Sequence, residues 1–244
     1  MEARLLAERL AARAGLAVTL SLAGRTAAPA PQPVPVRSGG FGGEAGLADY
    51  LVRERVDALV DATHPYASVI SAHALAAAGK VGVPLVMLQR APWSAVAGDR
   101  WIEVGDVREA ITALEGTPRR AFITLGRNEL KPLVAAPRHF YLIRSVDPVD
   151  PPLPVPQATY LTARGPFRES DEHALMTAHR IDAVIAKNSG GAATYGKIAA
   201  ARTLGIDVIL LRRPPAPAAP AVETVAEALA WLDHALSSTT ARGV

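Results

Sequence analysis

The sequence has no cysteine, few aromatic residues and no long hydrophobic run, and each absence excludes a class of function. Without cysteine the chain forms no disulfide and offers no thiolate for catalysis or for zinc and iron–sulfur ligation. No apolar run approaches the roughly 18 residues that cross a bilayer, and the N-terminus does not resemble a signal peptide, so we expect a cytoplasmic protein with no membrane partner. The basic residues are scattered and aromatic residues make up only 5%, which disfavours nucleic acid as a partner.

Several catalytic motifs are also missing. The sequence contains no GxxxxGK[ST] phosphate loop, no Gly-x-Ser-x-Gly nucleophile elbow and no His-x-x-x-His zinc pair. We therefore expect no metal site, and redox chemistry would require a bound organic cofactor. No GxGxxG turn precedes the first helical pattern, whereas a doubly wound domain normally opens on a strand that feeds such a turn. Either this lobe starts differently, or the strand and its turn are missing from the sequence, and we expect the second.

The 244 residues alternate between apolar runs and helical patterns, which is typical of βαβ units and predicts an α/β protein with mostly parallel sheets. The expected strands are Val18–Leu22, Ala58–Ala62, Pro84–Leu88, Trp101–Val104, Ala121–Leu125, Phe140–Arg144, Thr159–Thr162, Ala183–Ala186 and Val208–Leu211. The expected helices are Glu2–Arg13, Gly46–Arg55, Ser68–Ala78, Val107–Glu115, Asn128–Val134, Ser170–His179, Ala192–Thr203 and Val222–Leu236.

Proline clusters at 29–35, 148–156 and 214–220 indicate extended connections, because proline cannot continue a helix or a central strand. The stretch 91–117 carries only one short strand pattern and is the best candidate for a crossover between two Rossmann-like lobes. We place these lobes at residues 1–98 and 99–244, with a cleft between them.

Candidate cofactor-binding residues follow the first strand patterns, where parallel sheets bind their ligands. Arg25 could accommodate the 2′-phosphate of NADP with the help of Ser21 and Thr26, or it could be a solvated turn residue. The loop 39–43 has four glycines in five residues and could present N–H groups to a nucleotide, or it could be a hinge. The remaining candidates on this lobe are Gly24, Gly40, Phe41, Gly42, Thr63 and His64.

The role of His64 stays open at this stage. It lies at a predicted strand end and could contact the cofactor, contact the substrate or act as an acid, but a lone histidine is more often structural. Arg90 and Trp93 follow the next strand and could clamp a flat acidic ligand, although Trp93 could equally seal the seam between the lobes.

In the second half, arginine recurs just beyond three apolar runs, as Arg127, Arg144 and Arg164, which suggests a surface for a polyanion. Of the 26 basic residues 22 are arginine, which reflects either coding bias or recognition of carboxylates and phosphates. The segment 187–191 offers a cation, an amide and a glycine turn before a helix, as an anion site at a helix N-terminus would. The candidate ligand-binding residues here are Lys187, Asn188, Gly190, Gly191 and Lys197.

Taken in order, these motifs resemble the precorrin-6A reductase family of cobalamin biosynthesis. The resemblance runs through 23–26, 39–43, 61–67, Arg90-Ala91-Pro92-Trp93, 164–167 and Lys187-Asn188-x-Gly190-Gly191 with Lys197, and covers essentially the whole chain. It departs at the start, because family members begin with a strand and a Gly-Gly-Thr-x-Glu-Ala turn of which only the end is present here.

The resemblance implies an NADPH-dependent oxidoreductase that delivers hydride to ring carbon C19 of precorrin-6A and forms precorrin-6B. It also implies a polycarboxylate tetrapyrrole as substrate, and we add transient contact with neighbouring pathway enzymes as an expectation. The proton donor is not identified, and His64 and Tyr195 are the candidates. Two alternatives remain: a non-redox protein that binds a tetrapyrrole or a nucleotide, and a two-lobed tetrapyrrole enzyme without nicotinamide, similar to uroporphyrinogen-III synthase.

Overall fold

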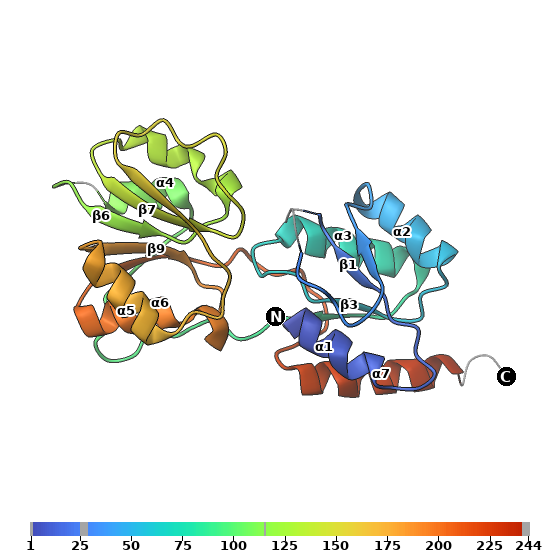
Figure 1. The fold of residues 1–244 in the computed structure, drawn as a ribbon. Helices are drawn as coiled ribbons and strands as arrows, with labels where there is room; N and C mark the ends of the chain where they lie inside the picture. The colour runs from blue at the N-terminus through green and yellow to red at the C-terminus, as the bar shows by residue number, and fades with distance from the viewer. Residues whose placement is uncertain (1, 25–28, 115, 241–244) are drawn as a thin grey trace. The chain divides into compact units, whose positions relative to one another are not determined.

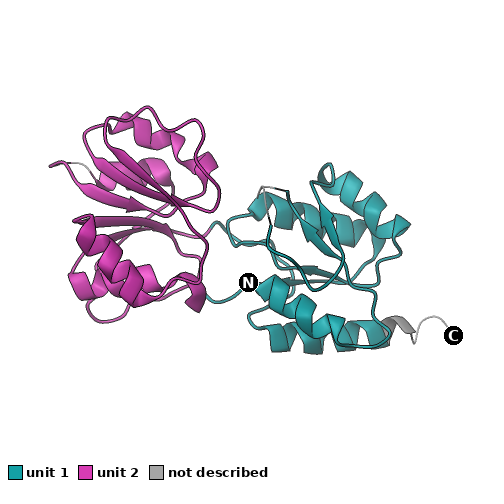
Figure 2. Ribbon diagram, in the orientation of Figure 1, with its two compact units in different colours: residues 1–91, 214–244 teal, residues 92–213 magenta. Residues whose placement is uncertain are grey.

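The computed structural model describes residues 2–24, 29–114 and 116–240 and divides the chain into two compact units. Unit 1 comprises residues 1–91 and 214–244, and unit 2 comprises residues 92–213 (Figure 2). Unit 1 is therefore built from both ends of the chain, while unit 2 is one continuous insertion. No helix in the described part of the chain combines the length and the apolar composition that crossing a membrane requires.

Unit 2 contains a six-stranded parallel sheet. Its strands are, in spatial order, β5 (Trp101–Val104), β10 (Asp207–Leu211), β9 (Ala183–Lys187), β6 (Arg120–Ile123), β7 (Phe140–Ser145) and β8 (Ala158–Thr162). The central strands are almost entirely apolar because helices cover both faces of the sheet, with α4 on one side and α5 and α6 together on the other (Figure 1). The helical elements are α4 (Val107–Ala113), η1 (Arg127–Glu129), η2 (Lys131–Ala135), α5 (Glu169–Ala178), η3 (Ala192–Thr194) and α6 (Gly196–Leu204).

The order of the strands reverses between β6 and β9. From β6 the chain adds β7 and β8 on one side, and it then returns to place β9 and β10 on the other side. Ligands of open α/β sheets bind outside the carboxyl ends of the strands at such a reversal. The turns that follow β6 and β9 are therefore the first place to search for a site in unit 2.

Unit 1 contains two small parallel sheets. The three-stranded sheet has the order β11 (Ala221–Val222), β4 (Leu85–Leu88) and β3 (Leu59–Asp61), and the two-stranded sheet pairs β1 (Leu20–Leu22) with β2 (Val36–Ser38). Helices α2 (Gly43–Arg53) and α3 (Ser68–Val81) pack against each other over one apolar cluster. Helices α1 (Glu2–Ala11) and α7 (Val225–Thr240) lie side by side over another (Figure 1).

The α/β class with mostly parallel sheets is confirmed, and every expected strand is present within a few residues of its predicted bounds. Two strands were not predicted. Both β2 and β11 lie at the edge of a proline cluster and have only three and two residues, which is too short for a recognisable pattern. The expected helix 128–134 is replaced by the 3₁₀ turns η1 and η2, with Pro132 in the first turn of η2.

The division into units differs from the expected one. The C-terminal residues 214–244 belong with unit 1, because β11 pairs with β4 and α7 packs on α1, and the boundary near residue 98 moves to 91. Contacts between segments so far apart in the sequence have no local signature. The cleft between the lobes stays a prediction.

Candidate functional site

In unit 1 the ends of β1 and β2 are joined by an arginine that lies just before the glycine loop. Ser21 pairs with Arg37 across the two strands. The Arg37 guanidinium donates to the carbonyl oxygen of Gly40 at 2.8 Å and to that of Gly39, and its carbon lies 3.7 Å above the Phe41 ring. Because its donors meet backbone carbonyls, Arg37 fixes the path of the loop.

The loop 39–43 uses its glycines for backbone shape. Gly39, Gly42 and Gly43 have positive φ, and the space where a Cβ would stand at Gly39, Gly40 and Gly42 is open. Gly24, with φ +72°, approaches the loop so closely that a Cβ added at this position would lie 3.3 Å from the backbone nitrogen of Gly39. The structure thus brings together Ser21, Gly24, Gly40, Phe41 and Gly42. The predicted residues Arg25 and Thr26 lie outside the described residues.

A second group of predicted residues lines a polar pocket of about 120 Å³ at the carboxyl ends of β3 and β4. The backbone N–H of Thr63 donates to Asp61 Oδ1 at 3.0 Å, and the Thr63 hydroxyl lies 3.2 Å from that of Ser71 on α3. His64 is exposed, and its Nδ1 accepts a hydrogen bond from the backbone of Tyr66 at 3.3 Å. The pocket is lined by Glu2, Ala62, Thr63, His64, Pro65, Leu88, Gln89 and Arg90.

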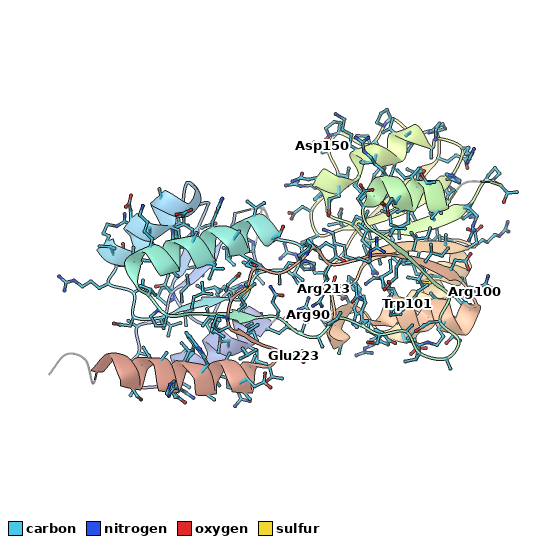
Figure 3. All side chains as sticks on the ribbon, turned by 180° about the vertical axis from the view of Figure 1, so that it is seen from behind. Arg90, Arg100, Trp101, Asp150, Arg213 and Glu223 are labelled. Carbon is cyan, nitrogen blue, oxygen red and sulfur yellow. The ribbon has the colours of Figure 1, made fainter. Side chains whose placement is uncertain are left out.

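Arg90 and Trp93, expected to act together, fall in different units. Arg90 (Figure 3) forms an ion pair with Glu2 of α1 inside the pocket of unit 1. Burial acts to raise the pKa of the Glu2 carboxyl, but a backbone hydrogen bond and the charge of Arg90 outweigh it and lower that pKa. Trp93 lies in unit 2, where its partners belong to the turn after β9.

In unit 2 the two turns at the strand reversal are joined by an ion pair. Lys187, the last residue of β9, lies 2.5 Å from Glu129 Oε2, and the same oxygen accepts the backbone N–H of Gly126 after β6 at 3.1 Å. Arg127 is exposed on η1 between these groups. The predicted cations Lys187 and Arg127 therefore lie on neighbouring turns.

Trp93 is held by three hydrogen bonds to the turn after β9. Its backbone N–H donates to Asn188 Oδ1 at 2.8 Å, its carbonyl accepts from Asn188 Nδ2 at 2.9 Å, and its indole N–H donates to the carbonyl of Gly191 at 2.9 Å. Positive φ at Gly190 and Gly191 allows this turn. An open pocket of about 330 Å³ is lined by Trp93, Ser94, Gly191, Ala192 and Tyr195.

Two predicted ligand-binding cations are buried within unit 2. Arg144 forms a bidentate ion pair with Glu172. The two side chains are only 7% and 2% exposed, and the guanidinium of Arg144 lies 3.6 Å from the centre of the Phe167 ring. Lys197 donates to the carbonyl of Thr194 at 2.7 Å and lies 5.1 Å above the Trp93 ring. Burial, with the charge of Arg144, lowers the pKa of Lys197 to about 7, although Glu172 acts in the opposite direction.

The two candidate acids also lie in different units. His64 faces the pocket of unit 1, while Tyr195 packs its ring 5.6 Å from Trp93 in unit 2. The Tyr195 hydroxyl contacts the guanidinium of Arg202, which pairs with Asp99 at 2.8 Å. Because arginine only donates, the tyrosine oxygen accepts this hydrogen bond and keeps its own proton for another acceptor.

Sequence reasoning missed the groups that hold the predicted residues in place: Arg37, Glu129, Glu172 and Arg213. Arg37 had a signal in the sequence, since a cation two residues before a loop with four glycines is suited to bind the carbonyls of that loop. The two glutamates had no such signal in the sequence, because Glu172 pairs with Arg144, 28 residues away, and Glu129 pairs with Lys187, 58 residues away. Such pairs appear only when the sheet is assembled.

Comparisons with known proteins cover the whole chain. A family model described as precorrin-6x reductase CbiJ/CobK matches residues 1–233. A precorrin-6A reductase of Sinorhizobium sp. is 51% identical over 97% of this chain and 90% of its own length, and that of Rhodobacter capsulatus is 48% identical over 100% and 96%. A solved structure described as CobK precorrin-6A reductase has a TM-score of 0.93 at 47% identity and covers 96% of this chain and 93% of its own.

Proposed function

This chain belongs to the precorrin-6x reductase family, and from this premise we propose that it uses NADPH to reduce one double bond of precorrin-6A, delivering hydride to ring carbon C19 and forming precorrin-6B. The family places the chain among the oxidoreductases of cobalamin biosynthesis. The observation that carries the proposal is 47–51% identity along nearly the full length to precorrin-6A reductases. A shared fold alone would not carry it, because one fold hosts many activities.

The residues of unit 1 fit a dinucleotide. The loop 39–43 leaves open space over three glycines and lies beside Gly24, at the carboxyl ends of two parallel strands. Asp61 is 5% exposed, and its Oδ2 has no hydrogen-bond partner among the described residues, so a donor such as a ribose hydroxyl or a carboxamide would find an acceptor there. Bound NADPH would supply the hydride.

The roles within unit 1 follow from these positions. Arg37 holds the glycine loop in shape, so that Gly40, Phe41 and Gly42 can contact the cofactor with little ordering on binding. Thr63 and His64 face the polar pocket, where they would contact the ribose or the phosphates. Arg25, with Ser21 and Thr26, would select the 2′-phosphate.

The proposed substrate-binding residues of unit 2 form two groups that differ in their exposure. Arg127 and the turn at Gly190 and Gly191 are presented at the strand reversal, and Trp93 offers the edge of an open pocket to a flat macrocycle. Arg144, Asn188 and Lys197 are each less than a tenth exposed, so they would act through their neighbours and not by touching the carboxylates. Lys187 contributes charge, partly balanced by Glu129.

The test is a turnover assay with the full chain. Precorrin-6A and NADPH are mixed without oxygen, and the loss of reduced nicotinamide is compared with the precorrin-6B formed. We expect one NADPH oxidised per macrocycle, and deuterium from the nicotinamide C4 should be found at C19 by NMR. Tetrapyrrole binding without NADPH oxidation would support the non-redox alternative, and conversion without NADPH would support the nicotinamide-free enzyme.

Cofactor choice is tested separately at Arg25. Arg25→Asp places a negative charge where the 2′-phosphate is proposed to bind, so it should weaken NADPH far more than NADH. Titration of both cofactors against the variant and the parent measures the ratio. An unchanged preference would remove Arg25 from the phosphate site and leave the reductase assignment intact.

A further inference from the structure

One buried amide in unit 2 touches both segments through which the chain enters and leaves that unit. Asn188, 7% exposed, pairs its side chain with the backbone of Trp93, which is the second residue of unit 2. Its backbone N–H donates to the carbonyl of Leu211 at 3.1 Å, and its carbonyl accepts the Nε–H of Arg213 at 2.8 Å. Arg213 (Figure 3) is the last residue of unit 2.

The chemistry of these contacts requires an amide. The N–H of Trp93 is a donor and its carbonyl is an acceptor, so the side chain at position 188 must offer one acceptor and one donor side by side. A carboxylate would place a second oxygen 2.9 Å from the Trp93 carbonyl and leave that carbonyl unpaired. An apolar side chain would leave both backbone groups of Trp93 without these partners in a partly buried position.

The same contacts bear on the open pocket. Trp93 and Gly191 both line it, and the indole N–H of Trp93 donates to the carbonyl of Gly191. The indole ring forms an edge-to-face contact with the Tyr195 ring, and the Lys197 ammonium lies above the indole. Once Asn188 fixes the backbone of Trp93, these contacts fix the plane of the indole.

We propose that Asn188 is a positioning residue of the reductase: its amide fixes Trp93 as the wall that the flat substrate meets, and its carbonyl fixes Arg213 at the other connecting segment. This inference rests on the proposed function and deepens it. In this role Asn188 acts through the backbone of Trp93, whereas the sequence suggested direct contact with a ligand. Its loss should therefore impair the use of precorrin-6A and spare the binding of NADPH.

The experiment uses Asn188→Asp in the full chain. Trp101 and Trp231 are first replaced by Phe, so that Trp93 is the only tryptophan and its emission reports on its surroundings. We expect the KM for precorrin-6A to rise about tenfold, because the partly buried carbonyl of Trp93 loses its donor, while the Kd for NADPH changes less than about twofold. The Trp93 emission should shift toward that of exposed indole.

The matched control is Gln157→Glu, the same amide-to-acid change at an exposed position of unit 2, which should alter none of the three readouts.

Two further variants decide the case in which N188D does not fold. Arg213→Met removes the bond to the Asn188 carbonyl and leaves the Asn188 side chain intact, and Trp93→Phe keeps the backbone pairing but loses the indole bond to Gly191. Each should raise the KM for precorrin-6A and leave NADPH binding unchanged. A parental KM and emission in N188D, or parental KM values in both other variants, would overturn the proposal. If the parent itself oxidises no NADPH with precorrin-6A, the proposed function fails, and the emission of Trp93 still tests the Asn188 contacts.

Discussion

The two units present polar residues at the ends of parallel strands, but they compensate charge in different ways. In unit 2, Arg144 and Lys187 each meet a carboxylate from another element, and Lys197 is buried next to the Arg144–Glu172 pair. In unit 1 Arg90 likewise meets the carboxylate of Glu2, but the Arg37 guanidinium, at the glycine loop, meets neutral backbone carbonyls and an aromatic ring. A cation at a strand end can therefore be a ligand for an anion, a partner in the core or a support for a loop.

This difference between the partners of cations bears on the three arginines that were predicted to form a polyanion site in unit 2. Three arginines at three strand ends suggested a common surface in unit 2. Arg144 instead lies in the core with Glu172, Arg164 lies 3.8 Å from Asp147, and Arg127 is exposed on η1. The partners and the exposure of these arginines thus differ although all three follow a strand, and their place in the sequence does not show which of them is open to an anion.

The largest loss of stability is expected from breaking the buried pair of unit 2. Glu172→Gln keeps the volume but leaves the Arg144 charge buried without a counterion, which should lower the free energy of unfolding by about 3 kcal/mol. Urea unfolding measures it. Glu8→Gln, which breaks the exposed pair with Arg4 in unit 1, should change the free energy by less than about 0.5 kcal/mol. Similar losses in both variants would show that the pair in unit 2 is no different from a surface pair.

A pH-dependent effect is expected at Lys197. Above pH 10.5 the lysine is neutral in the folded and unfolded states, so its burial carries no ionisation penalty. Between pH 10.5 and about 7 only the unfolded state binds the proton, and stability falls by up to about 1.4 kcal/mol per pH unit as the pH falls. Below about pH 7 both states are protonated, and the penalty is constant.

Lys197→Met removes this titration. We expect the variant to gain stability over the parent as the pH falls from about 10 to about 7, and the difference to level off below that. Unfolding by urea at several pH values measures the difference. A difference that does not vary with pH would mean that Lys197 stays charged in the folded protein.

A smaller effect, on the cofactor alone, is expected at Arg37. Arg37→Met removes the bonds to the carbonyls of Gly39 and Gly40, so the loop must be ordered on binding, and the Kd for NADPH should rise about tenfold. Arg53→Met is the control, because the guanidinium carbons of Arg37 and Arg53 each lie 5.5 Å from the centre of the Tyr50 ring, but the hydrogen bond of Arg53 goes to Glu54 and not to the loop. Calorimetric titration measures both. An effect of R37M on the KM for precorrin-6A, with NADPH affinity unchanged, would reverse the roles proposed for the two units.

The smallest effect is expected from two glycines at the C-terminal end of α3 in unit 1, one inside the helix and one capping it. Gly79 lies inside the helix with open space at its Cβ position, so Gly79→Ala should stabilise the protein by about 0.5–1 kcal/mol. Gly82 caps the same helix with φ +75°, so Gly82→Ala should destabilise it by a similar amount. Thermal unfolding compares them, and the same sign for both changes would contradict the backbone argument.

Much of the fold could be predicted from sequence because its signals are local. The apolar strands Ala183–Lys187 and Asp207–Leu211 are buried on both faces, and the polar residues that follow each of them in the sequence predict a turn there. The pairing of the C-terminal β11 with β4 was not predictable, since two residues carry no period and their partner lies more than a hundred residues away. For the same reason the expected boundary of the second lobe included the C-terminal helix.

The candidate site also has features that the sequence predicts and features that depend on the tertiary structure. By itself the sequence determined which residue types stand at strand ends: the glycine loop, Thr63 and His64, the Trp93 segment and the Lys187–Gly191 turn. Only the tertiary structure decided what each side chain meets, such as Asn188 with the backbone of Trp93 across 95 residues and Arg144 with Glu172 across 28. The physical reason is that strand and turn preferences act between neighbours in the chain, whereas hydrogen bonds and ion pairs form between neighbours in space.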